Sequence, residues 1–208
     1  MAVHAQITRQ ALRDQVGPRA LDAILRANLA QDGLRGQVGH PEYHFDDNAI
    51  PAGRLYIEAQ RRLIPPALRD GDAATAWAAF GRLSHTAQDF YAHTNYIALF
   101  LSRNGRGAPL PPSGIDPIDP ELDASPDLRS GKLYYPQEAL YYVPALRKFA
   151  LSFLPRDSHA HMNLDSAERG PHFEYAYHAA VKRTRLEFDQ VAALLAPDLM
   201  SLFRSAAS

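Results

Sequence analysis

The chain has 208 residues, of which 46% are hydrophobic and 22% are charged, a composition that suits one soluble globular domain with a sizeable core. Lysine and arginine (22) nearly balance aspartate and glutamate (23), so the net charge of -1 gives no basic field of the kind that gathers nucleic acid. Cysteine is absent, which excludes disulfides and thiolate metal sites and leaves His, Asp, Glu and the backbone as possible metal ligands.

The pattern of apolar residues predicts an all-α fold. Apolar positions recur at helical spacing in almost every segment between breakers, and β-branched residues are sparse. The expected helices, in chain order, span residues 7–15, 18–30, 51–68, 72–101, 136–154 and 171–195, followed by a short one over 197–204. Asp72 is suited to cap the fourth of these helices.

Two stretches interrupt the helical pattern. Residues 33–48 are rich in Gly, His and Asp, whereas residues 103–130 are rich in Pro and Gly and show little periodicity. Loops longer than about 12 to 15 residues in a compact domain are usually functional or disordered, so the second stretch is either a lid over a site or a mobile flap. We expect one domain over residues 1–208, with 103–130 as an irregular insertion.

The start of the chain lacks the features of a targeting segment. Its first 15 residues contain no apolar core long enough for a signal peptide, and no later stretch reaches the roughly 20 apolar residues of a membrane span. Either the protein is made without a classical signal, or the chain is a mature form from which a signal has been removed. The sequence leaves both alternatives, and therefore the localisation, open.

The string HTAQDFYAHTN, residues 85–95, places His85, Asp89 and His93 at steps of four. On a helix such residues share one face, each about 6 Å above the last, so the two histidines lie about 12 Å apart. A Zn–N bond is only about 2.0 to 2.1 Å, so these histidines cannot share one ion, and Asp89 is placed to bridge two ions. The alternative is that the three side chains are buried polar groups that bond to one another or to the backbone.

The other seven of the nine histidines in the chain fall in similar polar clusters. The first helix begins near His4, and Asp32 follows the second helix. The loop at 40–48 contains His40, His44, Asp46 and Asp47. The late segment contains His159, His161, Asp165, His172, Glu174 and His178.

The order of these motifs resembles the bacterial zinc-dependent phospholipase C family, and within it the HET-C-like branch, in which a DFYxHSN-type string is characteristic. The motifs are His4-x-x-Ile7-Thr8-x-x-Ala11-Leu12, Asn28-x-x-x-Asp32, His44-Phe45-Asp46 and His85-x-x-x-Asp89-Phe90-Tyr91-x-His93-Thr94-Asn95. The single-strand zinc nucleases look like more distant relatives with the same helical fold. The likeness runs from His4 to about Tyr96 and resumes weakly from Asn163 to Thr184.

The resemblance implies a multi-helix bundle with zinc ions in a cleft. One zinc would be bound by Asp32, His44, His85 and Asp89. His4 would share Asp89 with another ion, and His93 would begin the remaining site. In the family a His-x-x-x-Glu pair completes that site, but here Ala176 follows His172 at this spacing. His172 is the first candidate, and Asp165, Glu174 and His178 are alternatives. The family also uses the main chain of an N-terminal tryptophan, which is absent here, so we expect two or three ions.

The function implied by the resemblance is phosphodiester hydrolysis, most simply by a zinc-dependent phospholipase C. A metal-bound water would attack phosphorus, with Asp32 as ligand and proton acceptor. The expected partner is a phospholipid substrate at a membrane surface, such as phosphatidylcholine, with no stable nucleic-acid partner. The resemblance also favours a secreted or externally delivered protein. The alternatives are a zinc nuclease acting on single-stranded nucleic acid and a non-catalytic HET-C-like toxin or interaction module. The oligomeric state and headgroup preference stay open.

Overall fold

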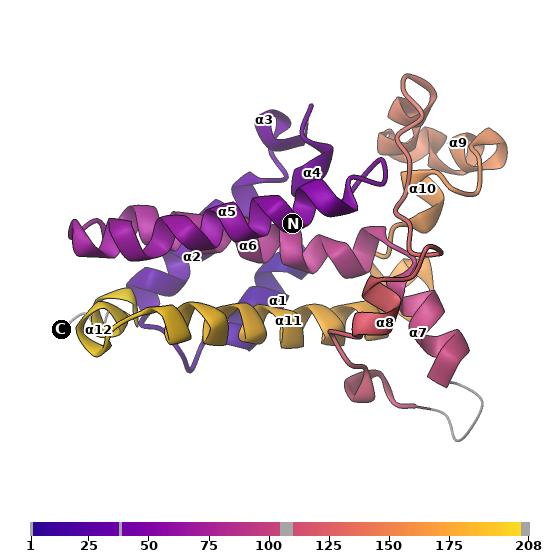
Figure 1. The fold of residues 1–208 in the computed structure, drawn as a ribbon. Coiled ribbons are helices and arrows are strands. Elements are labelled where there is room, and N and C mark those ends of the chain that lie inside the picture. The colour runs from indigo at the N-terminus through magenta and orange to yellow at the C-terminus, as the bar shows by residue number, and fades with distance from the viewer. Residues whose placement is uncertain (1, 38, 105–109, 205–208) are drawn as a thin grey trace.

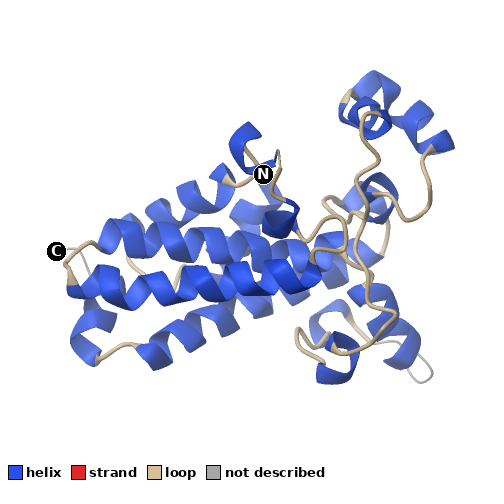
Figure 2. Cartoon of the chain, turned by 45° about the horizontal axis from the view of Figure 1, so that its top comes forward, coloured by secondary structure: helices blue, strands red, loops and turns tan. Residues whose placement is uncertain are grey.

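A computed structural model of the protein describes residues 2–37, 39–104 and 110–204. Within these ranges every continuous element is a helix, and strand-like pairing is limited to two isolated bridges, Thr94 with Ser130 and Lys132 with Ser158. Figure 2 accordingly shows helices joined by loops. The prediction of an all-α, multi-helix fold is confirmed. None of the described helices is both long and apolar enough to cross a bilayer.

The body of the molecule is a bundle built around one central helix (Figure 1). This helix, α6 (Ala73–His93), packs against α2 (Pro18–Ala30), α5 (Ile50–Arg69) and α11 (His172–Leu194). A further helix, α1 (Ala2–Leu12), lies against both α11 and α2. Because neighbours surround α6, most of its residues from Ala76 onward are buried, including the polar ones.

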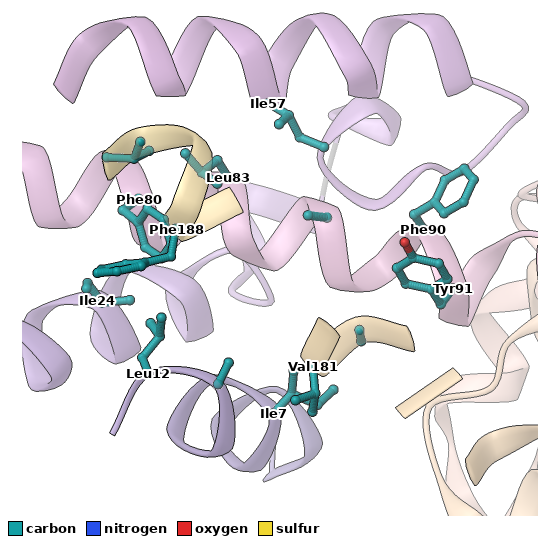
Figure 3. Close-up of a cluster of buried hydrophobic side chains, with 14 of the residues drawn as sticks. Ile7, Leu12, Ile24, Ile57, Phe80, Leu83, Phe90, Tyr91, Val181 and Phe188 are labelled. Carbon is teal, nitrogen blue, oxygen red and sulfur yellow. The ribbon is translucent and has the colours of Figure 1, made fainter. Parts of the chain in front are cut away.

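Apolar side chains from these helices form one continuous core (Figure 3). Phe80 of α6 makes edge-to-face contacts with Phe188 of α11 and with Phe203 of the last helix, α12 (Pro197–Arg204). Burying a phenylalanine of this kind stabilises the fold by roughly 1.5 to 3 kcal/mol relative to leaving it exposed. This aromatic cluster joins α6, α11 and α12, while Phe90 and Tyr91 extend the core towards the end of α6.

Helix boundaries match the prediction closely where caps and prolines mark them. The observed α2, α5, α11 and α12 agree with the expected helices to within one residue at either end, and α1 begins five residues earlier than expected. The Asp72 side chain accepts a hydrogen bond from the Thr75 amide at 3.0 Å and so caps α6, as predicted.

The helix predicted over residues 72–101 is two helices. The first, α6, ends at His93, and α7 (Tyr96–Asn104) begins after an extended Thr94. The Thr94 hydroxyl accepts a hydrogen bond from the Tyr96 amide at 3.2 Å, and the Asn95 amide donates to the carbonyl of Arg129 at 3.0 Å. These contacts replace the helical bonds, and they tie the end of α6 to a distant loop.

The helix predicted over residues 136–154 is broken as well. Two 3-10 helices, η2 (Gln137–Tyr142) and η3 (Pro144–Leu146), precede α9 (Arg147–Phe153). Pro144 has no amide hydrogen and pushes the preceding residue towards extended geometry, and Val143 is extended. The region projects from the bundle in both Figure 1 and Figure 2 and has a small core of its own, formed by Tyr141, Ala150, Leu154 and Ala160.

Short helices occupy the two predicted interruptions. Residues 33–48 contain α3 (Leu34–Gln37) and α4 (Pro41–His44), and the insertion at 103–130 contains η1 (Pro112–Gly114) and α8 (Pro120–Asp123). Residues 105–109 of that insertion lie outside the described residues.

The described part of the insertion is fastened to the bundle. Ile115 is fully buried and its carbonyl accepts a hydrogen bond from Lys182 of α11 at 2.6 Å, while the Tyr96 hydroxyl donates to the Asp116 carbonyl at 2.8 Å. Two further short helices, α10 (His159–Met162) and η4 (Ala167–Arg169), lead into α11.

Candidate metal centre

Three polar side chains of α6 lie on successive turns at the end of the bundle opposite the phenylalanine cluster. His85, Asp89 and His93 are all buried, with exposed fractions of 0%, 1% and 6%. A buried carboxylate is costly unless oppositely charged or hydrogen-bonding groups compensate it. The structure supplies such groups from elements that are far apart in the sequence.

The first group has His44, His85 and Asp89 at its centre and also includes His4 and Asp32. His44 is the last residue of α4, and Phe45 after it adopts a left-handed conformation (φ 56°) that ends the helix. His44 Nδ1 lies 2.9 Å from Asp89 Oδ2, and His85 Nε2 lies 3.0 Å from the same oxygen. The two nitrogens are 3.2 Å apart. Two imidazoles and one carboxylate therefore direct their polar atoms to a common point.

The other oxygen of Asp89 faces His4 of α1. His4 Nε2 is 3.1 Å from Asp89 Oδ1, and His4 Nδ1 bonds to Gln88 Oε1 at 2.8 Å, which orients the ring. The contact with Asp89 has the distance of an ion pair but not the geometry of a hydrogen bond, so Oδ1 is a buried acceptor without a hydrogen-bond donor. His85 Nδ1 is likewise buried and without a partner. Asp32 Oδ1 lies 3.7 Å from His85 Nε2.

The second group surrounds His93 at the end of α6. Asp46 Oδ1 lies 2.7 Å from His159 Nδ1 and 3.4 Å from His93 Nδ1. His93 Nδ1 is also 2.8 Å from the carbonyl oxygen of His44, while His93 Nε2 lies 3.1 Å from Asp165 Oδ1. A carbonyl can only accept, so Nδ1 of His93 carries a proton, and Nε2 is directed towards the Asp165 carboxylate.

A cavity of about 160 Å³ opens beside both groups. Its polar side includes His4, Asp32 and Asp89 of the first group and His93, His159 and Asp165 of the second. Its apolar side is formed by α1 and α11, with Val3, Ile7, Phe173, Ala176, Tyr177 and Ala180. None of the described residues of the 103–130 insertion lines this cavity, so the part of the predicted lid that the structure describes does not cover it.

The charges of the two groups are strongly coupled. Burial opposes a charge on His4, but the Asp89 carboxylate outweighs it and raises the pKa of His4 to about 9. Burial likewise opposes the charge of Asp89, yet the surrounding histidines hold its pKa well below the usual range. For His85 burial prevails and lowers the pKa. For His93 the Asp165 and Asp89 carboxylates overcome burial and raise the pKa.

Of the seven predicted ligands, five lie close together, one stands in a second group and one lies apart. The five are His4, Asp32, His44, His85 and Asp89, and His93 belongs to the second group. His172 is exposed at the start of α11 and lines a different hollow with Thr94 and Asn95. Of the alternatives to His172, Asp165 contacts His93, whereas Glu174 and His178 lie outside the groups described above.

Two residues of the second group were not among the predicted ligands. Asp46 lies two residues after His44 in the HFDD string, and His159 opens the HAH string where Ser158 caps α10. Both residues stood in clusters noted from the sequence, but only the fold brings residues 46, 93 and 159 together. His159 is held by backbone bonds to Lys132, because its amide donates to the Lys132 carbonyl at 2.9 Å.

The pKa shifts predict how the stability of the metal-free protein depends on pH. A raised pKa for His4 contributes stability that is fully present below 6.5 and is lost as the pH rises through about 9. The lowered pKa of Asp89 contributes stability that is fully present above pH 3.8, and the lowered pKa of His85 reduces stability only below pH 6.5. Neither shift therefore changes stability between pH 6.5 and about 9. In the presence of chelator, the unfolding temperature should decrease as the pH rises from 6.5 to about 9. The decrease should be smaller for His4→Gln. Equal falls in both proteins would contradict the role of His4.

A second prediction concerns Gly131, which joins three segments beside His93. Its amide donates to the His93 carbonyl at 3.0 Å, its carbonyl accepts from the Asp47 amide at 2.8 Å, and an added Cβ would lie 2.6 Å from the Cα of His159. Gly131→Ala should therefore lower the free energy of unfolding by roughly 1 to 3 kcal/mol, as measured by urea denaturation. The control is Ala139→Ser, a substitution at an exposed position later in the same region. An unchanged urea midpoint for Gly131→Ala would contradict the prediction, because the segment would then accommodate the added methyl group.

Comparison with known proteins identifies similarity over the N-terminal half. Residues 3–104 match the family described as "VWA7 N-terminal domain". Von Willebrand factor A domain-containing protein 7 of Rattus norvegicus and its Homo sapiens counterpart are each 36% identical to the chain over 80 residues. That segment is 38% of this chain but only 9% of each relative, so the chain corresponds to a small part of those proteins. No solved structure gives a significant match.

These comparisons overturn the interpretation of the chain as a zinc-dependent phospholipase C of the HET-C-like branch. The matching family and the relatives are of the VWA7 kind, and none is named as a phospholipase, nuclease or other hydrolase. The predicted phospholipase C activity, the enzyme class, and the nuclease and HET-C-like alternatives are therefore wrong. The order of histidines and aspartates on helices describes a set of donors, and donors alone do not specify a reaction. The chain is similar to the N-terminal domain of VWA7 over residues 3–104.

Proposed function

We propose that this chain is a metal-binding domain that holds divalent transition-metal ions in two adjoining centres at one end of the helical bundle. The observation that carries the proposal is the convergence of His44, His85 and Asp89. Three donor atoms from two separate elements approach a common point, and all three residues are buried.

The spacing of these donors fits a metal ion. The three edges of the triangle between His44 Nδ1, His85 Nε2 and Asp89 Oδ2 measure 2.9, 3.0 and 3.2 Å. Donors arranged as a tetrahedron with bonds of 2.0 to 2.1 Å would be about 3.3 to 3.4 Å apart, so a small adjustment accommodates the ion. Asp32 Oδ1 lies 3.7 Å from His85 Nε2 and forms a neighbouring set of possible donors with His4 and His85.

Hydrogen bonding alone accounts less well for this arrangement. A fully hydrogen-bonded network would satisfy each buried polar atom, yet His85 Nδ1 has no hydrogen-bond partner. Asp89 Oδ1 faces His4 Nε2 at 3.1 Å, and a metal ion that replaced the proton of His4 there would make the carboxylate a bridge between two ions. This is the role that the sequence predicted for Asp89.

In the second centre, a carboxylate orients the imidazoles that we propose as ligands. Asp46 faces the Nδ1 atoms of both His93 and His159, as carboxylates do when they orient metal-binding imidazoles. The Nε2 atom of His93 is then left for the ion, with Asp165 beside it. We therefore assign His93, His159 and Asp165 as ligands of this centre, and Asp46 as the residue that positions them.

The donor types favour a transition metal over calcium or magnesium. Both centres offer imidazole nitrogens and carboxylate oxygens and, in a chain without cysteine, no thiolate. Imidazole suits Zn, Cu, Fe and Ni, whereas Ca and Mg prefer oxygen. Zinc, as two or three ions, is the cofactor that we propose. With the hydrolase interpretation overturned, Asp32 is proposed as a ligand only.

Elemental analysis of the purified chain tests the proposal directly. Wild-type protein should carry close to two or three transition-metal ions per chain, and Asp89→Ala should lose the largest share because Asp89 faces both His4 and the His44–His85 pair. His178→Ala, which removes a histidine outside both centres, is the matched control and should keep the full content. A wild-type protein that binds no transition ion, even when zinc is supplied, would refute the proposal.

The assignment of the second centre gives a separate prediction. His159→Ala should remove one ion and leave the first centre filled, because His159 does not contact that group. His172→Ala should change nothing, because His172 is exposed at the start of α11. Isothermal titration calorimetry with zinc measures the number of ions that each variant binds. Loss of one ion from His172→Ala, and none from His159→Ala, would place His172 at the centre in place of His159.

A further inference from the structure

The projecting region carries an apolar surface that nothing in the described structure covers. Of the large apolar side chains described as exposed, more than half lie between residues 133 and 153. Four of them, which we call the apolar tip, lie between the residue that precedes η3 and the last residue of α9. They are Val143, Leu146, Phe149 and Phe153, with exposed fractions of 45%, 40%, 63% and 44%. Phe149 and Phe153 touch, with ring centroids 5.3 Å apart.

The apolar tip is separate from the face by which α9 folds. Ala150 is fully buried, and Leu154 is nearly so, in the small core with Tyr141 and Ala160. Leu146, Phe149 and Phe153 follow at steps of three and four, so they form a second stripe on the same short helix. A helix that is apolar on two sides usually has a second partner, and clustered exposed apolar residues mark interaction or membrane surfaces.

The charges around the apolar tip are positive. The segment 131–158 has four basic residues, Lys132, Arg147, Lys148 and Arg156, against two acidic ones, Glu138 and Asp157. Both acids are engaged within the segment. Glu138 is buried and accepts a hydrogen bond from the Tyr134 amide at 2.9 Å, and Asp157 pairs with Lys132 at 3.0 Å. Exposed Lys148 and Arg156 therefore leave a net positive rim beside the phenylalanines.

We propose that the apolar tip inserts into the interfacial layer of an anionic lipid bilayer, with the basic rim contacting the lipid phosphates and carboxylates. Aromatic and aliphatic side chains flanked by cations are the combination that binds such an interface. The region projects from the bundle in both views of the ribbon, so the bundle does not block its approach to a flat surface (Figures 1 and 2). The proposed contact involves only the apolar tip and its basic rim.

Binding to vesicles tests this proposal with the complete chain. Sedimentation with vesicles of phosphatidylserine and phosphatidylcholine should capture the protein, and vesicles of phosphatidylcholine alone should bind it several-fold more weakly. The double variant Phe149→Ala/Phe153→Ala should lower the affinity at least about tenfold, because two rings no longer leave water. Lys148→Glu should weaken binding to the anionic vesicles, and about 1 M salt should have the same effect.

Matched controls distinguish vesicle binding by the apolar tip from non-specific hydrophobic adsorption and from effects of the proposed metal centres. Leu55→Ala/Leu63→Ala removes two exposed leucines from α5 and should leave vesicle binding unchanged. Chelator should leave it unchanged as well, since the apolar tip shares no residue with either centre. A thermal melt confirms that each variant is folded. Absence of binding to every vesicle, or equal binding by the phenylalanine variant, would overturn the proposal. So would sedimentation velocity showing that the apolar tip pairs two copies of the chain.

Discussion

The contact of one buried carboxylate, Asp89, with three imidazoles is the interaction on which the arrangement of this protein depends. Asp89 is only 1% exposed, and a bare charge in that position would cost several kcal/mol. The compensating rings come from three different elements, α1, α4 and α6 itself. Packing of the helices and assembly of the polar group therefore depend on each other, because misplacing α1 or α4 would remove an imidazole from the carboxylate.

The backbone of residues 130–132 extends this organisation to the second group. Gly131 bonds to the end of α6 and to the loop after α4, while Lys132 bonds to the segment that presents His159. An added side chain at Gly131 would collide with His159, so the close approach requires glycine. This junction places His159 beside His93 and also forms the base from which the projecting region departs. The second group and the apolar tip thus both adjoin residues 130–132, but they have no residue in common.

Local signals in the sequence predicted most of the helices, and they failed where long-range contacts decide. Periodicity and caps such as Asp72 located the long helices, and the four-residue spacing correctly placed His85, Asp89 and His93 on one face. The break at Thr94 depends on bonds from Asn95 to a loop more than 30 residues away, which no local pattern contains. The interruption at Pro144 was readable in principle, since proline and the extended residue before it both oppose a continuous helix.

The candidate centres divide in the same way between what spacing determines and what the tertiary fold determines. Residues 3–104, which match the VWA7 N-terminal domain, supply His4, Asp32, His44, His85 and Asp89, the whole of the first group. His159 and Asp165, which surround His93 in the second group, lie beyond that match. His172 was preferred because a family spacing was carried over, whereas the fold brings Asp165 to His93 instead. Spacing along α6 fixes His85, Asp89 and His93, whereas the tertiary fold decides which residues surround His93. All residues of the first group precede the projecting region in the chain, yet Asp89 also raises the pKa of His93 and so couples the two groups electrostatically.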